Sequence, residues 1–153
     1  FIPNEFLPSQ KQVINTNNIF KFMDRNTFHN QNNLASNPPP QIFRLKLIQE
    51  LISIYKLWHD FLPHFPKDSR YTLGTKIDNL FLETTELIVG GSYSDKLKKL
   101  IYLKKASVKM DLLKFFLQVA WEIKSLDNKK YISLSEKTGD AGRMLGGWIK
   151  SLK

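Results

Sequence analysis

Apolar residues recur at alternating steps of four and three from about Gln41 onward, which is the spacing of a single helix face. The first such segment ends at Pro63 and Pro66, because proline removes a backbone donor and breaks a helix. Its predicted inward face carries Leu47, Leu51, Ile54, Trp58 and Phe61.

Three further segments repeat the spacing and predict three further helices. The second carries Leu73, Ile77, Leu80, Thr84 and Leu87, with Ser69 or Thr72 as its cap and Gly90 and Gly91 at its end. The third runs from a cap at Ser94 or Asp95 to about Ser125 and carries Leu103, Ala106, Met110, Leu113, Leu117 and Ala120. The fourth follows a cap at Asp127 and carries Leu134, Thr138, Ala141, Leu145, Trp148 and Leu152. Short connections and a period near 3.5 predict an all-α, up-down antiparallel four-helix bundle.

Residues 1–40 differ from this pattern. They are rich in asparagine and glutamine and end in the sequence NPPP. A segment of this composition buries little apolar surface, so we expect a disordered tail. The predicted organisation is a tail over residues 1–40 and a bundle domain over residues 41–153.

The third helix carries a second apolar stripe that one bundle core cannot cover. At 100° per residue this stripe lies well away from the first one. It consists of Leu97, Ile101, Val108, Leu112, Phe115, Val119 and Ile123. Extra apolar surface favours self-association, and the first six residues are the predicted oligomer interface. The alternative is that the tail or a wide, irregular core covers the stripe.

Composition narrows the class of partner. The net charge is +9 and the isoelectric point is near 9.7, which suits nucleic acid, an acidic protein surface or anionic lipid. The chain has no cysteine, so it has neither disulfides nor a thiolate metal site, and a cytoplasmic setting fits best. No apolar run reaches the roughly 18 residues of a membrane span, and no signal peptide is evident.

Lysines form two rows on the third helix beside its apolar stripes. Lys98, Lys105 and Lys109 lie on one line, and Lys96, Lys104 and Lys114 lie on another. Such rows are candidate phosphate contacts, although a lysine row is also the ordinary composition of a solvated helix face.

Glycines accompany the cations of the last helix. Arg143 and Lys150 share a face, and Gly139, Gly146 and Gly147 flank them opposite the core stripe. Each glycine costs a helix about 1 kcal/mol relative to alanine, so we expect the bare surface to admit a backbone, a helix or a phosphate. The alternative is that Gly146 and Gly147 begin a frayed C-terminus.

The chain offers little for catalysis. His59 and His64 lie near Asp60, but their spacing across a helix end fits no standard metal site. Glu83 and Glu86 share a helix face, as solvated carboxylates commonly do. No phosphate-binding loop, nucleophile elbow or dinucleotide glycine pattern occurs, so we expect a protein without enzymatic activity, metal or cofactor.

Three segments resemble a known family in order and separation. They are FPKDSRYTLG (65–74), LKKASVKMDLLKFFLQVAWEI (103–123) and GRMLGGWIK (142–150). The chain is similar to the four-helix-bundle proteins that include the accessory variability protein (Avd) of diversity-generating retroelements. Proteins encoded by intervening sequences in bacterial 23S ribosomal RNA genes belong to the same group. The resemblance covers about residues 41–153.

This resemblance implies a basic pentameric assembly, without catalytic activity, that associates with a reverse transcriptase. It also implies binding of RNA or DNA while template RNA is copied mutagenically into cDNA. By position, Arg70, Lys98, Lys105, Lys109, Arg143 and Lys150 would contact nucleic acid. The TGDA segment (138–141) departs from the family pattern and puts Thr138 and Ala141 in core positions. The alternative function is a module that docks an acidic protein partner without binding nucleic acid.

Overall fold

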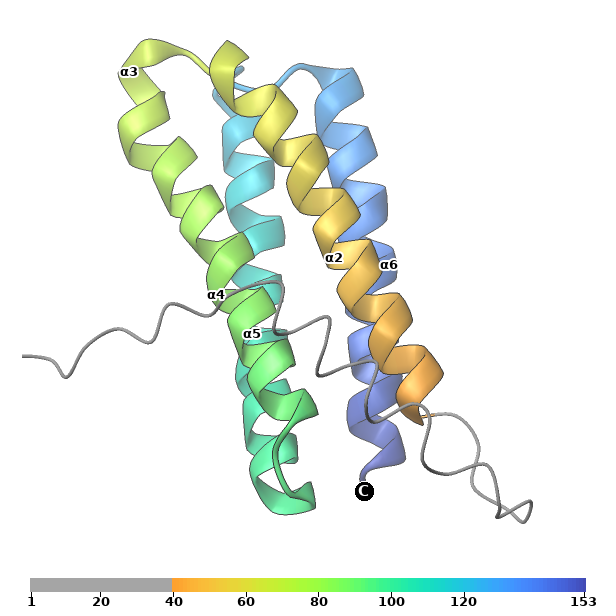
Figure 1. Cartoon of the computed structure of the whole chain (residues 1–153). Helices are drawn as coiled ribbons and strands as arrows, with labels where there is room; N and C mark the ends of the chain where they lie inside the picture. Colours follow the sequence, from red (N-terminus) through yellow and green to blue (C-terminus); the bar gives the residue numbers. More distant parts are fainter. Residues whose placement is uncertain (1–39) are drawn as a thin grey trace, which may run out of the picture. The chain divides into compact units, whose positions relative to one another are not determined.

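The structure, a computed structural model, describes residues 40–153, with side chains from Arg44 onward. Within these residues four long helices run up and down in turn (Figure 1). They are α2 (Pro40–Phe61), α4 (Thr75–Ser92), α5 (Lys96–Glu122) and α6 (Asn128–Ser151). Residues 40–153 contain no strand, and the predicted all-α four-helix bundle is confirmed. The predicted tail lies outside the described residues, apart from Pro40, which begins α2.

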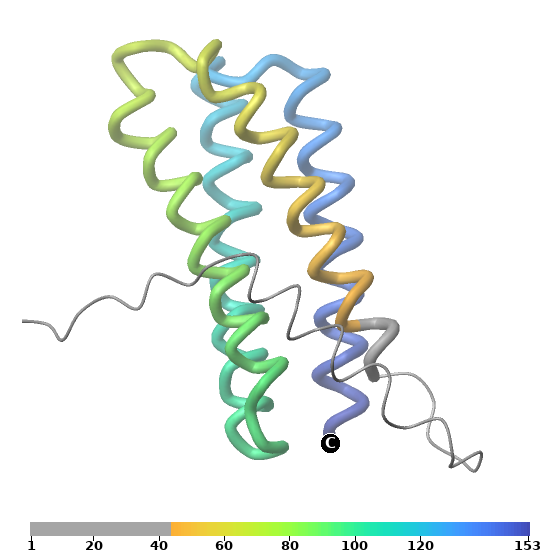
Figure 2. Tube along the Cα trace, in the orientation of Figure 1, coloured from red at the N-terminus to blue at the C-terminus, as the bar shows by residue number. Residues whose placement is uncertain are grey.

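The helices form a ring in which each one packs against two antiparallel neighbours. Helix α5 packs between α4 and α6, and α2 completes the ring between the same two helices (Figure 2). Consequently α2 and α5 begin at the end of the bundle where α4 and α6 finish. We call this the Ser94 end, after the α4–α5 connection. The opposite end, which holds the α2–α4 and α5–α6 connections, is the Ser69 end.

The core is built from the predicted stripes, which are buried except at their ends. Phe61, Leu73, Leu87 and Leu152 are only half-buried. Five buried hydrophobic residues lie outside the predicted stripes: Ile48, Phe65, Phe81, Ile88 and Leu126. Phe65 follows the first helix in extended backbone and packs its ring edge-on to Trp58, with centroids 5.8 Å apart. A helical period cannot find such a residue, because Phe65 is not in the helix.

Polar residues in the core bond to their own helices. Thr84, Ser92 and Thr138 are buried, and each hydroxyl donates to the carbonyl oxygen four residues earlier. The distances are 2.6, 2.9 and 2.7 Å. Thr138 therefore occupies a core position, as predicted, without leaving a buried hydroxyl unsatisfied.

Two aspartates cap helices, as the sequence predicts. Asp95 accepts a hydrogen bond from the Lys98 amide at 3.0 Å, and Asp127 accepts one from the Lys130 amide at 2.9 Å. These hydrogen bonds from backbone amides stabilise the carboxylates and lower the pKa of both aspartates. Of the two caps predicted for the third helix, the structure selects Asp95 over Ser94.

The predicted start of the second helix is wrong. Helical backbone already begins at α3 (Lys67–Ser69) and passes through the π-helical turn η3 (Arg70–Gly74) into α4. The amides of Ser69 and Arg70 both donate to the Pro66 carbonyl, so Ser69 and Thr72 lie inside the helical stretch. Neither caps a helix, and the Ser69 hydroxyl instead bonds to that of Ser125 at 3.0 Å.

Two predicted helix ends are also shifted. Helix α4 continues through Gly90 and Gly91 to Ser92, because these glycines pack closely against α5 rather than ending the helix. Helix α5 ends at Glu122 instead of Ser125, and Lys124 then adopts a φ of 61°, which turns the chain toward α6.

Candidate nucleic-acid interface

The charges are distributed unequally between the two ends of the bundle. The Ser94 end gathers the start of α2, the start of α5 and the end of α6. It carries Arg44, Lys46, Lys96, Lys98, Lys99, Lys104, Lys105, Arg143, Lys150 and Lys153, against Glu50, Glu86, Asp95 and Asp140. The Ser69 end carries Lys56, Lys67, Arg70, Lys76, Lys114, Lys124, Lys129 and Lys130, against Asp60, Asp68, Asp78, Asp111, Glu122, Asp127 and Glu136. The excess positive charge is therefore concentrated at the Ser94 end.

The predicted lysine row of α5 lies on the surface, but its members differ in availability. The Lys98 side chain is 72% exposed and lies 3.8 Å from the Asp95 carboxylate, a weak and solvated pair. Lys105 is exposed and has no ion-pair partner among the described residues. Lys109 lies nearer the middle of the bundle, and its ammonium is 2.7 Å from Glu83 Oε2. Lys98 and Lys105 are thus the available cations of the row.

Arg70 lies at the Ser69 end, away from the other predicted contacts. Its Nη2 donates to the carbonyl oxygens of Pro63 and Phe65 at 2.6 and 2.7 Å, and its Nε donates to Phe65 at 3.0 Å. The guanidinium is therefore hydrogen-bonded to the turn between α2 and α4, in which the Phe65 ring packs against Trp58. Contact between Arg70 and nucleic acid stays a prediction, and the geometry gives this residue a structural role in the fold.

Asp78 links α4 to α2 through a hydrogen bond. Its carboxylate accepts a hydrogen bond from Trp58 Nε1 at 3.1 Å, and the Tyr55 hydroxyl lies beside it. Partial burial raises the pKa of Tyr55, and the negative charge of Asp78 raises it further. The FPKDSRYTLG segment and its surroundings thus form a packed and hydrogen-bonded corner of the bundle.

Arg143, Lys150 and the predicted close-approach glycines lie together on the outer face of α6. The Arg143 guanidinium pairs with Asp140 on the same face, while Lys150 is exposed. A Cβ added at Gly146 or Gly147 would meet nothing within 4 Å, and one at Gly139 would meet only Arg143. The alternative of a frayed end is wrong, because α6 continues to Ser151. These glycines leave an open surface on a regular helix.

Other glycines make close contacts between helices that were not expected from the sequence. A Cβ at Gly91 would lie 3.1 Å from Tyr102 Cβ and 3.3 Å from Leu103 Cδ2. At Gly142 it would lie 2.7 Å from Lys114 Nζ. Helical spacing places these glycines on seams with α5, and that geometry could have suggested their packing role.

The second apolar stripe of α5 is uncovered, as predicted. Leu97, Val108 and Phe115 are 73%, 61% and 56% exposed. Ile101 and Leu112 are also exposed, and Val119 is half-buried. The bundle core formed by the described residues does not reach this face, which contradicts the alternative of a wide, irregular core. Coverage by the tail would involve residues outside the described part.

The remaining candidate chemistry is not assembled into a site. His59 and His64 are both exposed near the end of α2, and no three potential metal ligands cluster anywhere in the described chain. Glu83 pairs with Lys109, and Glu86 is exposed. A shallow hollow of about 400 Å³ lies along the outer side of α2, lined mainly by Gln49, Ile52, Ser53, Lys56 and Asp60. Among the helices described, none is both long and apolar enough to span a membrane.

Comparison with known proteins identifies the family of the chain. A search of curated proteins gave no match. The family model described as bAvd-like matches residues 45–152, which span nearly all of α2 and every element through α6. The match covers well over half of the chain. It includes Arg70 and the turn to which it bonds, the uncovered face of α5 and nearly all of the Ser94 end. The chain therefore belongs to the bAvd-like family.

Proposed function

We propose that this protein is a non-enzymatic, oligomeric accessory protein of a diversity-generating retroelement. In this role it binds RNA or cDNA and associates with the reverse transcriptase during mutagenic copying. Membership of the bAvd-like family supports the role. The observation that carries the nucleic-acid part is the concentration of cations at the Ser94 end beside the uncovered face of α5.

The chemistry of the Ser94 end favours phosphates over bases. Lys98 and Lys105 present mobile ammonium groups, which bind phosphates as point charges and carry little information about sequence. Binding of this kind is driven largely by the release of counterions, so it weakens steeply as salt rises. The protein would accordingly bind many sequences with similar affinity.

Fluorescence anisotropy with labelled RNA and DNA tests this proposal. Titrations between about 50 and 200 mM salt should show a linear fall of log affinity with log salt, with a slope near −0.9 for each duplex phosphate contacted. Oligonucleotides of equal length and unrelated sequence should bind alike. An affinity that stays flat over this salt range contradicts the phosphate model.

Self-association is the second element of the proposal, and the family resemblance suggests five copies. Val108 and Phe115 project from the uncovered face of α5, where a partner copy would bury them. Light scattering should report an oligomer for the natural protein and a smaller species for a Val108→Asp, Phe115→Asp variant. Ile132→Asp is the matched control, because Ile132 is 50% exposed on α6. A natural protein that is monomeric contradicts this element.

The reverse transcriptase partner is tested by co-purification with and without nuclease. A complex that depends on bridging RNA should dissociate after nuclease treatment, whereas a direct protein complex should persist. Persistence of partners together with absent affinity for RNA and DNA would favour the alternative, a module that docks an acidic protein.

A further inference from the structure

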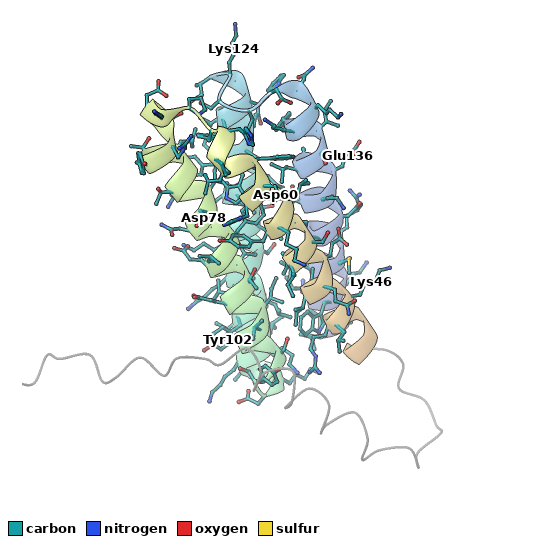
Figure 3. All side chains as sticks on the ribbon, turned by 45° about the horizontal axis from the view of Figure 1, so that its top comes forward. Lys46, Asp60, Asp78, Tyr102, Lys124 and Glu136 are labelled. Carbon is teal, nitrogen blue, oxygen red and sulfur yellow. The ribbon has the colours of Figure 1, made fainter. Side chains whose placement is uncertain are left out.

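An aromatic residue lies within the lysine row of α5. Lys98, Tyr102, Lys105 and Lys109 follow one another at steps of four, three and four, so they share one face of the helix. Tyr102 is 38% exposed. Figure 3 shows Tyr102 on the half of the bundle away from Lys124, which marks the Ser69 end. The row therefore contains a flat apolar ring between its two available cations.

The Tyr102 side chain packs over two glycines of α4, Gly90 and Gly91. A Cβ at Gly90 would lie 3.5, 3.7 and 3.9 Å from Cε1, Cδ1 and Cζ of Tyr102, so the ring extends across this glycine. At Gly91, a Cβ would lie 3.1 Å from Tyr102 Cβ. Helix α4 thus packs against one side of the Tyr102 side chain, and its two glycines let α5 approach closely. The ring is partly exposed to solvent, and within the described chain no hydrogen bond restrains the Tyr102 hydroxyl.

We propose that Tyr102 stacks on a base of single-stranded nucleic acid whose phosphates contact Lys98 and Lys105. This inference rests on the proposed function and specifies the form of nucleic acid at the Ser94 end. A supported aromatic ring between cations is the arrangement that binds single strands with little sequence preference, because every base has a π-face. Bases in a duplex are already stacked, so the ring adds affinity only for unpaired segments.

The Glu83–Lys109 pair marks one limit of this surface. The Glu83 carboxylate lies 2.7 Å from the Lys109 ammonium and neutralises much of its charge. Phosphates flanking the stacked base would therefore approach Lys98 and Lys105, which lie on either side of Tyr102 along α5.

Replacement of the ring provides the first test. Anisotropy titrations would compare a single-stranded oligouridine with an RNA duplex of the same length. Tyr102→Leu should weaken single-strand binding by about 5- to 150-fold, the range measured for loss of one aromatic stack. Duplex affinity and the salt slope should not change, because the lysines remain. Tyr102→Phe keeps the ring and should bind as the natural protein does. Single-strand affinity that is unchanged in Tyr102→Leu overturns the inference.

A pair of alanine substitutions tests the seat of the ring. Gly91→Ala places a methyl group against Tyr102 Cβ and should shift the ring, which lowers affinity for the oligouridine. Gly90→Ala meets the ring only at ordinary contact distances and should preserve that affinity, so it is the matched control. Equal affinities for these two variants contradict a seated ring.

Photo-crosslinking examines the natural protein and does not depend on how a variant folds. RNA containing 5-iodouridine should crosslink to the peptide that contains Tyr102. Crosslinks confined to other peptides overturn the inference. Failure of the natural protein to bind any nucleic acid would instead reject the proposed function. Equal single-strand and duplex binding, with no effect of Tyr102→Leu, would reject only the stacking role.

Discussion

The two ends of the bundle use the same cationic residue types in different ways. At the Ser69 end, Arg70 bonds to two carbonyl oxygens, and Lys130 pairs with Asp127 and lies 5.5 Å from the centroid of the Phe61 ring. At the Ser94 end, Lys104, Lys105 and Lys150 have no ion-pair partner within the described chain. Each end also has cations of the other kind: Lys98 and Arg143 are paired at the Ser94 end, and Lys67 and Lys129 have no ion-pair partner among the described residues at the Ser69 end. The ends differ in net charge, because the cations of the Ser69 end lie among almost as many carboxylates. Positive charge therefore indicates a binding surface only where neither the fold nor neighbouring carboxylates offset it.

Charge reversal at each end should give the largest difference between them. Lys98→Glu with Lys105→Glu should weaken nucleic-acid binding on the order of 100-fold near 0.1 M salt, because each of the two lost contacts contributes roughly tenfold. The slope of log affinity against log salt should fall by about 2. Anisotropy titrations across a salt series measure both quantities.

The control for this reversal lies at the Ser69 end. Lys67→Glu with Lys129→Glu makes the same change in net charge at exposed positions and should alter affinity only slightly. Equal losses in the two variants would show that total charge, rather than its location, determines binding. Reversal of Lys105 together with Lys109 should also weaken binding while helicity is retained. It is a less selective test, because Lys109→Glu places a carboxylate beside Glu83.

Substitution of Arg70 should affect folding instead of binding. Arg70→Ala removes charge-assisted hydrogen bonds to Pro63 and Phe65 and should lower the free energy of unfolding by roughly 1.5–3 kcal/mol. Arg70→Lys keeps the charge but loses the planar fork, so it should also destabilise the protein. Urea denaturation followed by circular dichroism measures this loss. A lysine variant with natural stability and an alanine variant with a reduced salt slope would instead support a phosphate contact.

The outer glycines of α6 test whether the Ser94 end includes a surface that a phosphate or another backbone approaches. Alanine at Gly146 and Gly147 meets open space and should stabilise the helix by up to about 1 kcal/mol per site. If a phosphate or another backbone approaches this surface, the same substitutions should weaken nucleic-acid binding or self-association. Thermal unfolding and anisotropy, measured on one variant, separate the two effects. Greater stability with unchanged binding and unchanged oligomer size would remove these glycines from the interface.

Periodicity in the sequence was sufficient to predict the helices and both faces of α5. The heptad stripe fixes which side of α5 faces the core, so the exposure of Val108 and Phe115 follows from their angular position. The caps at Asp95 and Asp127 were also predictable, because a carboxylate before a helix bonds to its first free amides.

The remaining features depend on which residues of different helices meet. Gly91 makes a close contact only because α5 places Tyr102 and Leu103 against it. The family resemblance implies a nucleic-acid contact at Arg70, and the sequence does not show that the turn from Pro63 to Phe65 directs its carbonyls at the guanidinium. The concentration of positive charge at one end depends on the antiparallel order of the helices, which brings the start of α5 and the end of α6 to the same end of the bundle. Local spacing can place a residue on a face of its helix, but it does not show which residue of another helix that face meets.

The two helix caps should show the smallest effects, and they allow the same interaction to be compared at both ends. Asp95 caps α5 at the Ser94 end, and Asp127 caps α6 at the Ser69 end. In the folded state the pKa of both carboxyls is lowered, chiefly by the hydrogen bonds that the backbone amides of Lys98 and Lys130 donate. A depressed folded-state pKa stabilises the protein above the unfolded value, near 3.9, and this contribution disappears as pH falls through the folded value.

On account of these caps, the melting temperature should change little between about pH 7 and 5. It should decrease once the pH is lowered below about 4. Asp95→Asn and Asp127→Asn should each lower the melting temperature at pH 7 only slightly, because asparagine caps a helix about as well as aspartate and only the negative charge at the helix N-terminus is lost. Both substitutions should also reduce the decrease in acid. Their effects on nucleic-acid binding should differ. Asp95→Asn removes a negative charge from among the lysines of the Ser94 end and should increase affinity at low salt, while Asp127→Asn should not. Equal increases in affinity for both variants would show that the Ser94 end has no special role in binding, because the two substitutions make the same change in net charge.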